Sequence, residues 1–158
     1  MKKYEQSELK LNEYAVPTNF HDMSIVNMEF ENDKLIIKFS LAEYLDDFNI
    51  LEDDKHHAIL QVVYEGIKIE KMNLTGVIDF RTLDVYHLYD ENGVIELHAY
   101  NRYLGCYLLF KFSITNYKWS VVDVIPSVEY YNFRESLSEC EDGLSKSRDI
   151  ELPSWAKL

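Results

Sequence analysis

Two histidines with the clearest potential for joint chemistry, His87 and His98, lie on either side of the dipeptide Asn92-Gly93. Asn-Gly is the strongest short-range signal for a β-hairpin, because both central residues of its tight turn need positive φ angles. A two-residue turn at this position places His87 directly opposite His98 on the neighbouring strand. Tyr89 and Glu96 then form the next pair on the same face, since side chains two apart share a face. The register therefore predicts a cluster of tyrosine, histidine and glutamate.

Such a cluster has several chemical uses. Neutral imidazole is a common metal ligand, and histidine with glutamate can transfer protons. Tyrosine joins a large apolar surface to a polar tip, which suits it to contacts with a ligand or a partner protein. We predict a binding role, with Tyr86 and Tyr100 beside the four residues above and with no bound metal. The alternative is a solvated face on which these side chains only pair with each other, and a slip of one residue would separate the two histidines.

Other reactive side chains give no recognisable site. The acidic run from Glu52 to His57 lacks the glycine-centred pattern of a calcium loop and the ligand spacing of a zinc site, so we expect a solvated connection. The chain has no Gly-x-Ser-x-Gly turn, no glycine-rich phosphate loop and no Cys-x-x-Cys. Cys106 is predicted to be a small buried hydrophobe. We expect no catalytic residue and no cofactor, with His21-Asp22 kept as an alternative acid–base pair.

The charge of the chain restricts its partners. The 158 residues include 28 acidic and 16 basic side chains, for a net charge of −12. This charge repels phosphate backbones and anionic lipid, so we expect neither nucleic acid nor membrane as a partner. No apolar run approaches the roughly 20 residues of a membrane helix, and the polar start at residues 1–6 does not predict a signal peptide. We therefore expect a cytoplasmic protein with a basic protein partner, or one whose acidity only keeps it in solution.

Alternating apolar residues predict the strands that must position these side chains. The clearest strand runs from Leu104 to Ile114 and is apolar at every second position, so this row should face a core. Further strands are predicted at residues 24–31, 34–41, 58–64, 67–72, 74–80, 83–89, 94–100 and 119–125. Closely spaced strands with short turns favour antiparallel pairing. We predict a mainly β protein, either an antiparallel sandwich or a partly open barrel.

The period changes after Pro126. Apolar residues then follow at steps of four, three and four, which predicts one C-terminal helix: Phe133, Leu137, Cys140 and Leu144. We expect residues 1–158 to form a single domain, with residues 145–158 as a tail that Trp155 anchors.

The segment Phe20–Ile25, followed by Met28-Glu29-Phe30 and the turn Asn32–Leu35, resembles the opening of several small bacterial β domains. Some of these are grouped with immunity proteins of polymorphic toxin systems. The resemblance covers about the first quarter of the chain and implies a protein that binds and blocks a toxin enzyme. It assigns no functional residue. Our leading hypothesis is a non-enzymatic interaction protein of the immunity or inhibitor type, and the alternative is a β domain that binds a small molecule.

Overall fold

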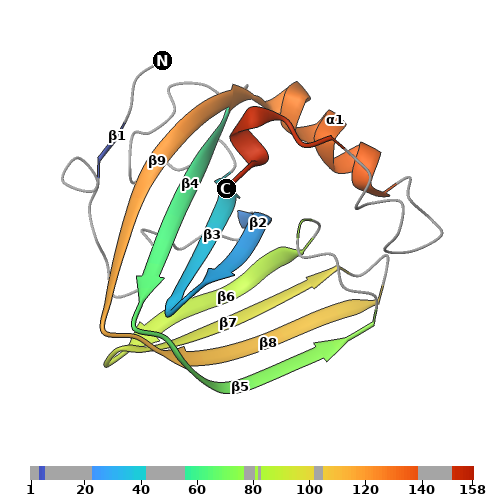
Figure 1. The fold of residues 1–158 in the computed structure, drawn as a ribbon. Helices are drawn as coiled ribbons and strands as arrows, with labels where there is room; N and C mark the ends of the chain where they lie inside the picture. Colours follow the sequence, from blue (N-terminus) through green and yellow to red (C-terminus); the bar gives the residue numbers. More distant parts are fainter. Residues whose placement is uncertain are drawn as a thin grey trace.

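The computed structural model describes residues 4–5, 23–41, 56–76, 81, 83–101, 105–138 and 151–158. Its elements are β1 (Tyr4–Glu5), β2 (Met23–Glu31), β3 (Lys34–Leu41), β4 (His56–Glu65), β5 (Lys68–Thr75), β6 (Asp84–Glu91), β7 (Val94–Asn101), β8 (Cys106–Ser113), β9 (Asn116–Pro126), α1 (Ser127–Ser138) and η3 (Ser154–Ala156). The strands form one antiparallel sheet in the order β1-β9-β4-β3-β2-β6-β7-β8-β5 (Figure 1). The sheet curls without closing, so the predicted mainly β, partly open barrel with one helix near the C-terminus is confirmed.

A sharp corner joins the two halves of the sheet. The upper half contains β1, β9, β4, β3 and β2, and the lower half contains β6, β7, β8 and β5. At this corner β4 continues into β5 and β8 continues into β9, while the halves spread apart on the other side (Figure 1). The amide of Ile67 donates to the carbonyl of Asp33 over 3.0 Å, and the amide of Thr115 donates to the carbonyl of Glu65 over 2.9 Å. Gly66 adopts a φ of +63°, and a Cβ atom there would lie 2.3 Å from Thr115 Oγ1. Glycine is therefore required where the two corner segments touch.

The main core fills the space between the two halves. On β8, the predicted apolar row is confirmed for Cys106, Leu108, Phe110 and Phe112, which are all at most 5% exposed. These side chains pack against the inward-facing residues of the other long strands in one cluster. Each large apolar side chain buried in this way contributes about 1.5 to 3 kcal/mol. Leu104 lies outside the described residues.

The two halves are joined only briefly on the side away from the corner. There β2 pairs with β6 through Met23–Val85 and Ser24–Asp84. Arg134 of α1 reinforces this junction: its Nη2 donates to Asp84 Oδ2 over 2.7 Å, and Ser24 Oγ donates to Asp84 Oδ1 over 2.9 Å. Through Arg134, α1 is therefore attached to the short junction between β2 and β6.

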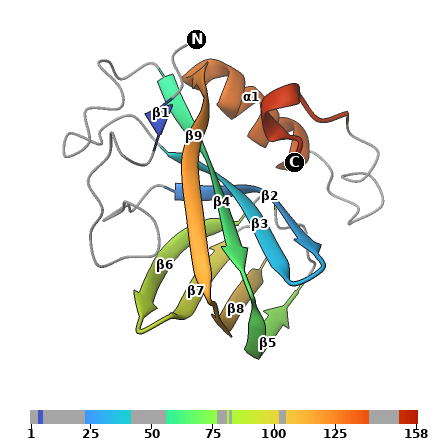
Figure 2. The ribbon, with the colours of Figure 1, turned by 60° about the vertical axis from the view of Figure 1, so that its left-hand side comes forward.

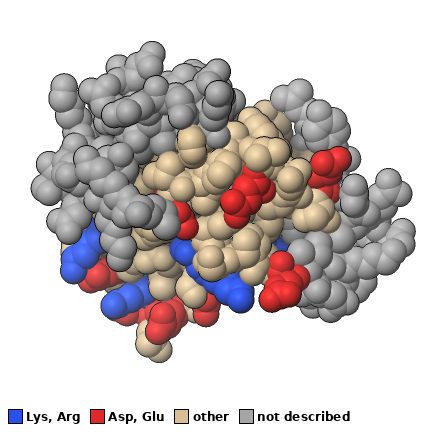
Figure 3. Space-filling model, turned by 90° about the horizontal axis from the view of Figure 1, so that it is seen from above, with Lys and Arg blue, Asp and Glu red and all other residues tan. Residues whose placement is uncertain are grey.

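A second core lies on the outer face of the upper half, beneath α1 and η3 (Figure 2). A bulge between Ile25 and Asn27 turns Val26 to this face, where it is fully buried. Val26 shares the cluster with strand residues Ile59 and Ile125, helix residues Tyr130 and Phe133, and Trp155 and Ala156 of η3. Seen from above, uncharged side chains cover most of the described surface over this core, and charged ones are scattered (Figure 3).

The C-terminal segment 151–158 is held on this face by side chains of β2 and β3. Lys38 Nζ donates to the carbonyl oxygens of Trp155, over 3.1 Å, and of Lys157. Asn27 Nδ2 donates to the carbonyl oxygen of Ala156 over 3.0 Å. Burial lowers the pKa of Lys38, and the carboxylate of Asp123 acts in the opposite direction. This half of the predicted tail is therefore packed against the sheet with Trp155 as its anchor, and residues 145–150 lie outside the described part.

Two of the predicted elements need revision. The separate strand predicted at residues 74–80 is wrong at its start, because Leu74 and Thr75 continue β5 to its end beside Gly76, and residues 77–80 lie outside the described residues. The predicted helix begins at Ser127, earlier than its apolar stripe, and Phe133 is buried as predicted. Cys140 and Leu144 lie outside the described residues. Neither described helix has the length and apolar character that crossing a membrane requires.

Candidate functional site

The predicted pairing of β6 with β7 is confirmed. Asn92 and Gly93 form the turn with φ angles of 54° and 80°, and Glu91 opposes Val94. Tyr89 opposes Glu96 and His87 opposes His98. All four of these side chains lie half-buried on the outer face of the sheet, alternating with buried residues that face the core.

A β-bulge brings a fifth predicted residue to this face. The register of β6 shifts between Val85 and His87, so Tyr86 is the extra residue of the bulge. It is 49% exposed, and its ring centroid lies 5.4 Å from that of Tyr100 at an angle of 67°. Tyr107 of β8, opposite Tyr100, completes the group. We call this group the Tyr–His–Glu patch: Tyr86, His87, Tyr89, Glu96, His98, Tyr100 and Tyr107.

A chain of hydrogen bonds fixes the patch. Glu96 Oε2 accepts from the hydroxyl of Tyr89 over 2.8 Å, and its Oε1 lies 2.8 Å from His98 Nε2. His98 Nδ1 lies 3.1 Å from the hydroxyl of Tyr86 and 3.1 Å from that of Tyr107, and the two hydroxyls are 3.0 Å apart. His87 packs against the group, with its ring centroid 4.9 Å from that of His98.

The chemistry of these groups sets the direction of the hydrogen bonds. A carboxylate only accepts, so His98 donates from Nε2 to Glu96, and Nδ1 of the neutral ring is an acceptor. One tyrosine hydroxyl then donates to Nδ1, and the second donates to the first. Each oxygen of Glu96 accepts one hydrogen bond from the patch, and the hydroxyls of Tyr86 and Tyr107 converge on His98. Five side chains are thus positioned before any ligand arrives.

The ionisation of the patch follows from the same contacts. Hydrogen bonds from His98 and Tyr89 lower the pKa of Glu96. The hydrogen bond with Tyr107 is the main cause that raises the pKa of Tyr86 to about 12, with burial and the neighbouring tyrosines adding to it. Burial, and then the nearness of His98, lower the pKa of His87. Glu96 therefore keeps its negative charge, and His87 its neutral form, to lower pH than an isolated side chain would.

A hollow of about 290 Å³ adjoins the patch on the same face. It is lined by Glu70, Tyr89, Glu91, Asn92, Val94, Glu96 and Lys111. Three carboxylates surround it against one ammonium group, so its local charge is negative. Tyr89 and Glu96 belong to both the hollow and the patch, which makes the two features continuous.

No match to this chain is found among protein-family models, curated proteins or solved structures. The site offers aromatic surface, phenolic hydroxyls and carboxylate oxygens. Among the described residues no group of three or more histidine, cysteine, aspartate or glutamate side chains has the geometry to hold a metal ion.

Among the residues that the structure describes, the other reactive groups do not form a second accessible site. His57 Nδ1 lies 2.8 Å from Ser127 Oγ, an arrangement of nucleophile and base, but the two residues are only 2% and 8% exposed beneath α1. A substrate could not reach them without displacing the helix. The thiol of Cys106 is buried in the main core. The predicted alternative His21-Asp22 and residues 52–55 of the acidic run lie outside the described residues.

Replacing Tyr107 by phenylalanine should lower the pKa of Tyr86 from about 12 toward the ordinary value of about 10. The substitution removes the hydroxyl whose hydrogen bond is the main cause of the shift. Titration of ¹³Cζ-labelled tyrosine by NMR measures this directly. Tyr131→Phe, on exposed Tyr131 of α1, is the matched control and should leave the Tyr86 signal unchanged. An unaltered Tyr86 titration in Tyr107→Phe would show that the two hydroxyls do not interact.

Proposed function

We propose that this chain is a non-enzymatic protein-interaction module that binds a partner with a basic surface through the Tyr–His–Glu patch and its adjoining hollow. The observation that carries the proposal is the fixed, half-exposed Tyr86 cluster beside three carboxylates. Tyrosine-rich surfaces with a polar rim are typical of protein interfaces.

Preorganisation supports this role. Ordering a flexible side chain on association costs about 0.5 to 1.5 kcal/mol. The hydrogen bonds among Tyr86, Tyr107, His98 and Glu96 already order these side chains in the free protein. Their conformational entropy is therefore lost mainly when the protein folds, and little more is lost when a partner binds. The aromatic surface of Tyr86 and Tyr100 remains available to a partner.

Charge and size together indicate what the hollow would accept. Its three carboxylates favour a cation, and the ring of Tyr89 can add a cation–π contact. Pockets for drug-sized ligands measure about 300 to 1,000 Å³ and are mostly apolar. The hollow is slightly smaller than this range, and four of its seven lining residues are charged. An arginine or lysine side chain of a partner fits these properties better than an extended organic ligand.

The same geometry disfavours acid–base catalysis at the patch. A general base needs a free lone pair within reach of a substrate proton. Nδ1 of His98 faces two hydroxyls, and the hydrogen bonds that Glu96 accepts from His98 and Tyr89 lower its pKa, which weakens it as a base. The proposal therefore treats these groups as contact residues.

A more specific form of the proposal is that the partner is a toxin enzyme and the chain its inhibitor. Support comes from the resemblance of residues 20–35 to the opening of immunity-type domains and from the net charge of −12, which suits a basic target. Opposite charges accelerate association and make it sensitive to salt. The charge and the patch alone support only the broader form, a module for basic protein surfaces.

An arginine-rich peptide tests the proposal. Labelled octa-arginine should bind saturably, and Tyr86→Ala and Glu96→Gln should each weaken binding about tenfold, the loss expected for one interface contact of about 1.4 kcal/mol. Raising the salt concentration from about 50 mM to 300 mM should weaken it further. Fluorescence anisotropy provides the measurement.

Matched controls keep this test specific. Tyr131→Ala and Glu29→Gln change one exposed tyrosine and one exposed glutamate outside the patch and should bind like the native chain. Equal losses in the patch and control variants would reduce the interaction to net charge and reject the patch. The alternative function is a small-molecule site, and the hollow is the observation that motivates it. Thermal stabilisation by a sugar, lipid or metal ion would favour this alternative if Tyr86→Ala abolished it and the peptide did not bind.

A further inference from the structure

Strand β5 is the last strand of the sheet, and β8 is its only neighbour among the described residues (Figure 2). Its side chains are more exposed than those of any other long strand, and all but that of Met72 are exposed. Ile69 is 52% exposed and Leu74 is 37% exposed, although both oppose buried residues of β8. An open edge with uncovered apolar side chains on its core side is a place where another strand can pair.

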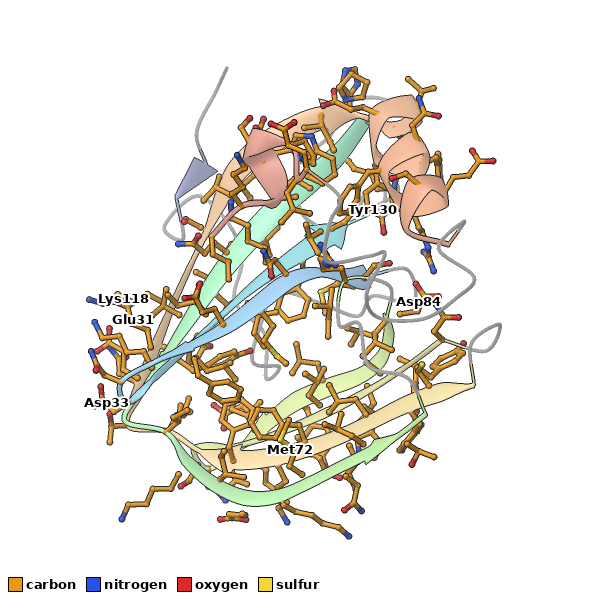
Figure 4. All side chains as sticks on the ribbon, turned by 45° about the vertical axis from the view of Figure 1, so that its right-hand side comes forward. Glu31, Asp33, Met72, Asp84, Lys118 and Tyr130 are labelled. Atoms are coloured by element: carbon orange, nitrogen blue, oxygen red, sulfur yellow. The ribbon has the colours of Figure 1, made fainter. Side chains whose placement is uncertain are left out.

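A bulge makes the face pattern of β5 symmetric. Ile69 opposes Phe112 and Met72 opposes Phe110, so both face the core side although they are three residues apart. The labelled side chain of Met72 lies between the two halves of the molecule (Figure 4). Between these two, Glu70 lines the outer hollow, and Lys71 opposes Lys111, whose side chain lines the same hollow. The side chains of Ile69 and Met72 therefore face the core side, and those of Glu70 and Lys71 between them face the outer side.

We infer that β5 is a self-recognition edge, on which a second copy of this chain pairs antiparallel about a two-fold axis between Glu70 and Lys71. This register sets Glu70 opposite Lys71 of the second copy, and Lys71 opposite its Glu70. It also sets Ile69 opposite Met72 of the second copy on the core side. Two positions further out, beyond Lys68 opposite Asn73, half-buried Ile67 meets Leu74. This inference does not depend on the function proposed for the Tyr–His–Glu patch.

The charged pairs and the apolar pairs formed in this register are favourable. Directly opposed opposite charges and apolar pairs each contribute about 0.2 to 1 kcal/mol across antiparallel strands. Pairing also satisfies the free backbone groups of the edge and covers Ile69 and Leu74. Lysines and bulges usually protect an edge, but here the bulge aligns Lys71 with Glu70 of the other copy. A slip by one residue toward residue 72 would oppose Lys71 to itself.

Size and net charge limit the strength of the association. A single pair of eight-residue strands is a small interface of the weak class. The net charge of −12 on each copy opposes association, and salt screens this repulsion over about 8 Å at 0.15 M. We therefore expect a reversible dimer that forms at high protein concentration.

Charge exchange at the axis tests the inference. In sedimentation velocity experiments at about 0.15 M salt and up to about 1 mM protein, where even a millimolar dimer is populated, the native chain should dimerise. Lys71→Glu and Glu70→Lys each oppose like charges at the axis and should weaken dimerisation at least tenfold. The double variant E70K/K71E restores opposite pairs and should restore the dimer. Lys34→Glu, at an exposed lysine of the β2–β3 hairpin, is the control for net charge.

Two further outcomes would overturn the inference. One is a native chain that stays monomeric up to about 1 mM, and the other is a double variant no better than Lys71→Glu. Amide hydrogen exchange gives a second measurement that needs no variant: exchange at Ile69 and Met72 should slow as protein concentration rises. Slowing on β1 or on its neighbour β9 instead would place the contact at the opposite side of the sheet. A strand from a different protein as the occupant would leave the native chain monomeric.

Discussion

Replacing Trp155 by alanine should lower the free energy of unfolding by about 3 to 5 kcal/mol, the usual cost of removing a large buried aromatic side chain. Trp155 is 5% exposed and packs edge-on against Phe133, with ring centroids 4.9 Å apart. Its Nε1 donates to Glu129 Oε1 over 2.8 Å. The loss would be a large share of the stability typical of a protein of this size. Urea denaturation followed by circular dichroism measures it as a lower midpoint.

Trp155→Ala should destabilise the protein by more than the cavity it leaves, because Trp155 holds the segment that covers Lys38. The ammonium group of Lys38 is buried and donates to carbonyls of this segment. If the segment detached, this charge would face solvent and the second core would lose its cover. Trp155→Phe keeps a ring but loses the Nε1 donor, so a cost of about 1 kcal/mol is expected. Leu158→Ala, at a residue 40% exposed in the same segment, should cost less than either. A loss below about 1 kcal/mol for Trp155→Ala would show that the segment does not pack on the sheet.

The hairpin that carries the site could be predicted because its information is local. Asn92-Gly93 specifies the turn, the turn sets the register, and the register opposes His87 to His98. Every step uses residues close in sequence. The apolar alternation of β8 is equally local, which is why its buried row was also predictable.

The β-bulges could not be predicted from local sequence in the same way. At Tyr86, Glu70 and Val26 one extra residue shifts the faces of a strand. None of the three positions carries glycine or another local signal of a bulge. Strict alternation would turn Tyr86 away from His87, yet the bulge places it on the same face, where it contacts His98. The convergence of the tyrosine hydroxyls is therefore a result of packing.

The hollow and the C-terminal clamp required knowledge of strand order. Glu70 lines the hollow because β5 pairs with β8. The strands next to β5 in the sequence, β4 and β6, lie elsewhere in the sheet. Lys38 and Trp155 are 117 positions apart. Tyr107 could have been added to the predicted site, because it alternates outward on β8; its position opposite Tyr100 follows only from the pairing of β7 with β8.

His57 occupies the other chemically unusual position in the molecule. It is 2% exposed, its ring stacks on that of Tyr130 at a centroid distance of 4.6 Å, and its Nδ1 is paired with Ser127 Oγ. Tyr131 contacts the ring edge-on. These neighbours are uncharged, so nothing compensates an imidazolium ion there. Burial accordingly lowers the pKa of His57 from 6.5 to about 4.

This depressed pKa predicts a loss of stability in mild acid. Below pH 6.5 the unfolded chain gains a proton at His57, while the folded chain stays neutral there until about pH 4. The unfolded state thus binds more protons over this window, so stability falls as pH falls, by roughly 2 to 3 kcal/mol in total. Urea denaturation between pH 7 and pH 4 should show this slope in the native chain and in His56→Gln, the substitution of the adjacent half-buried histidine. His57→Gln should be less stable at pH 7 and lack this part of the slope, since it has no group to protonate. A native chain and His57→Gln with parallel pH profiles would mean that protons reach His57 in the folded state, and that α1 does not seal the site as its packing requires.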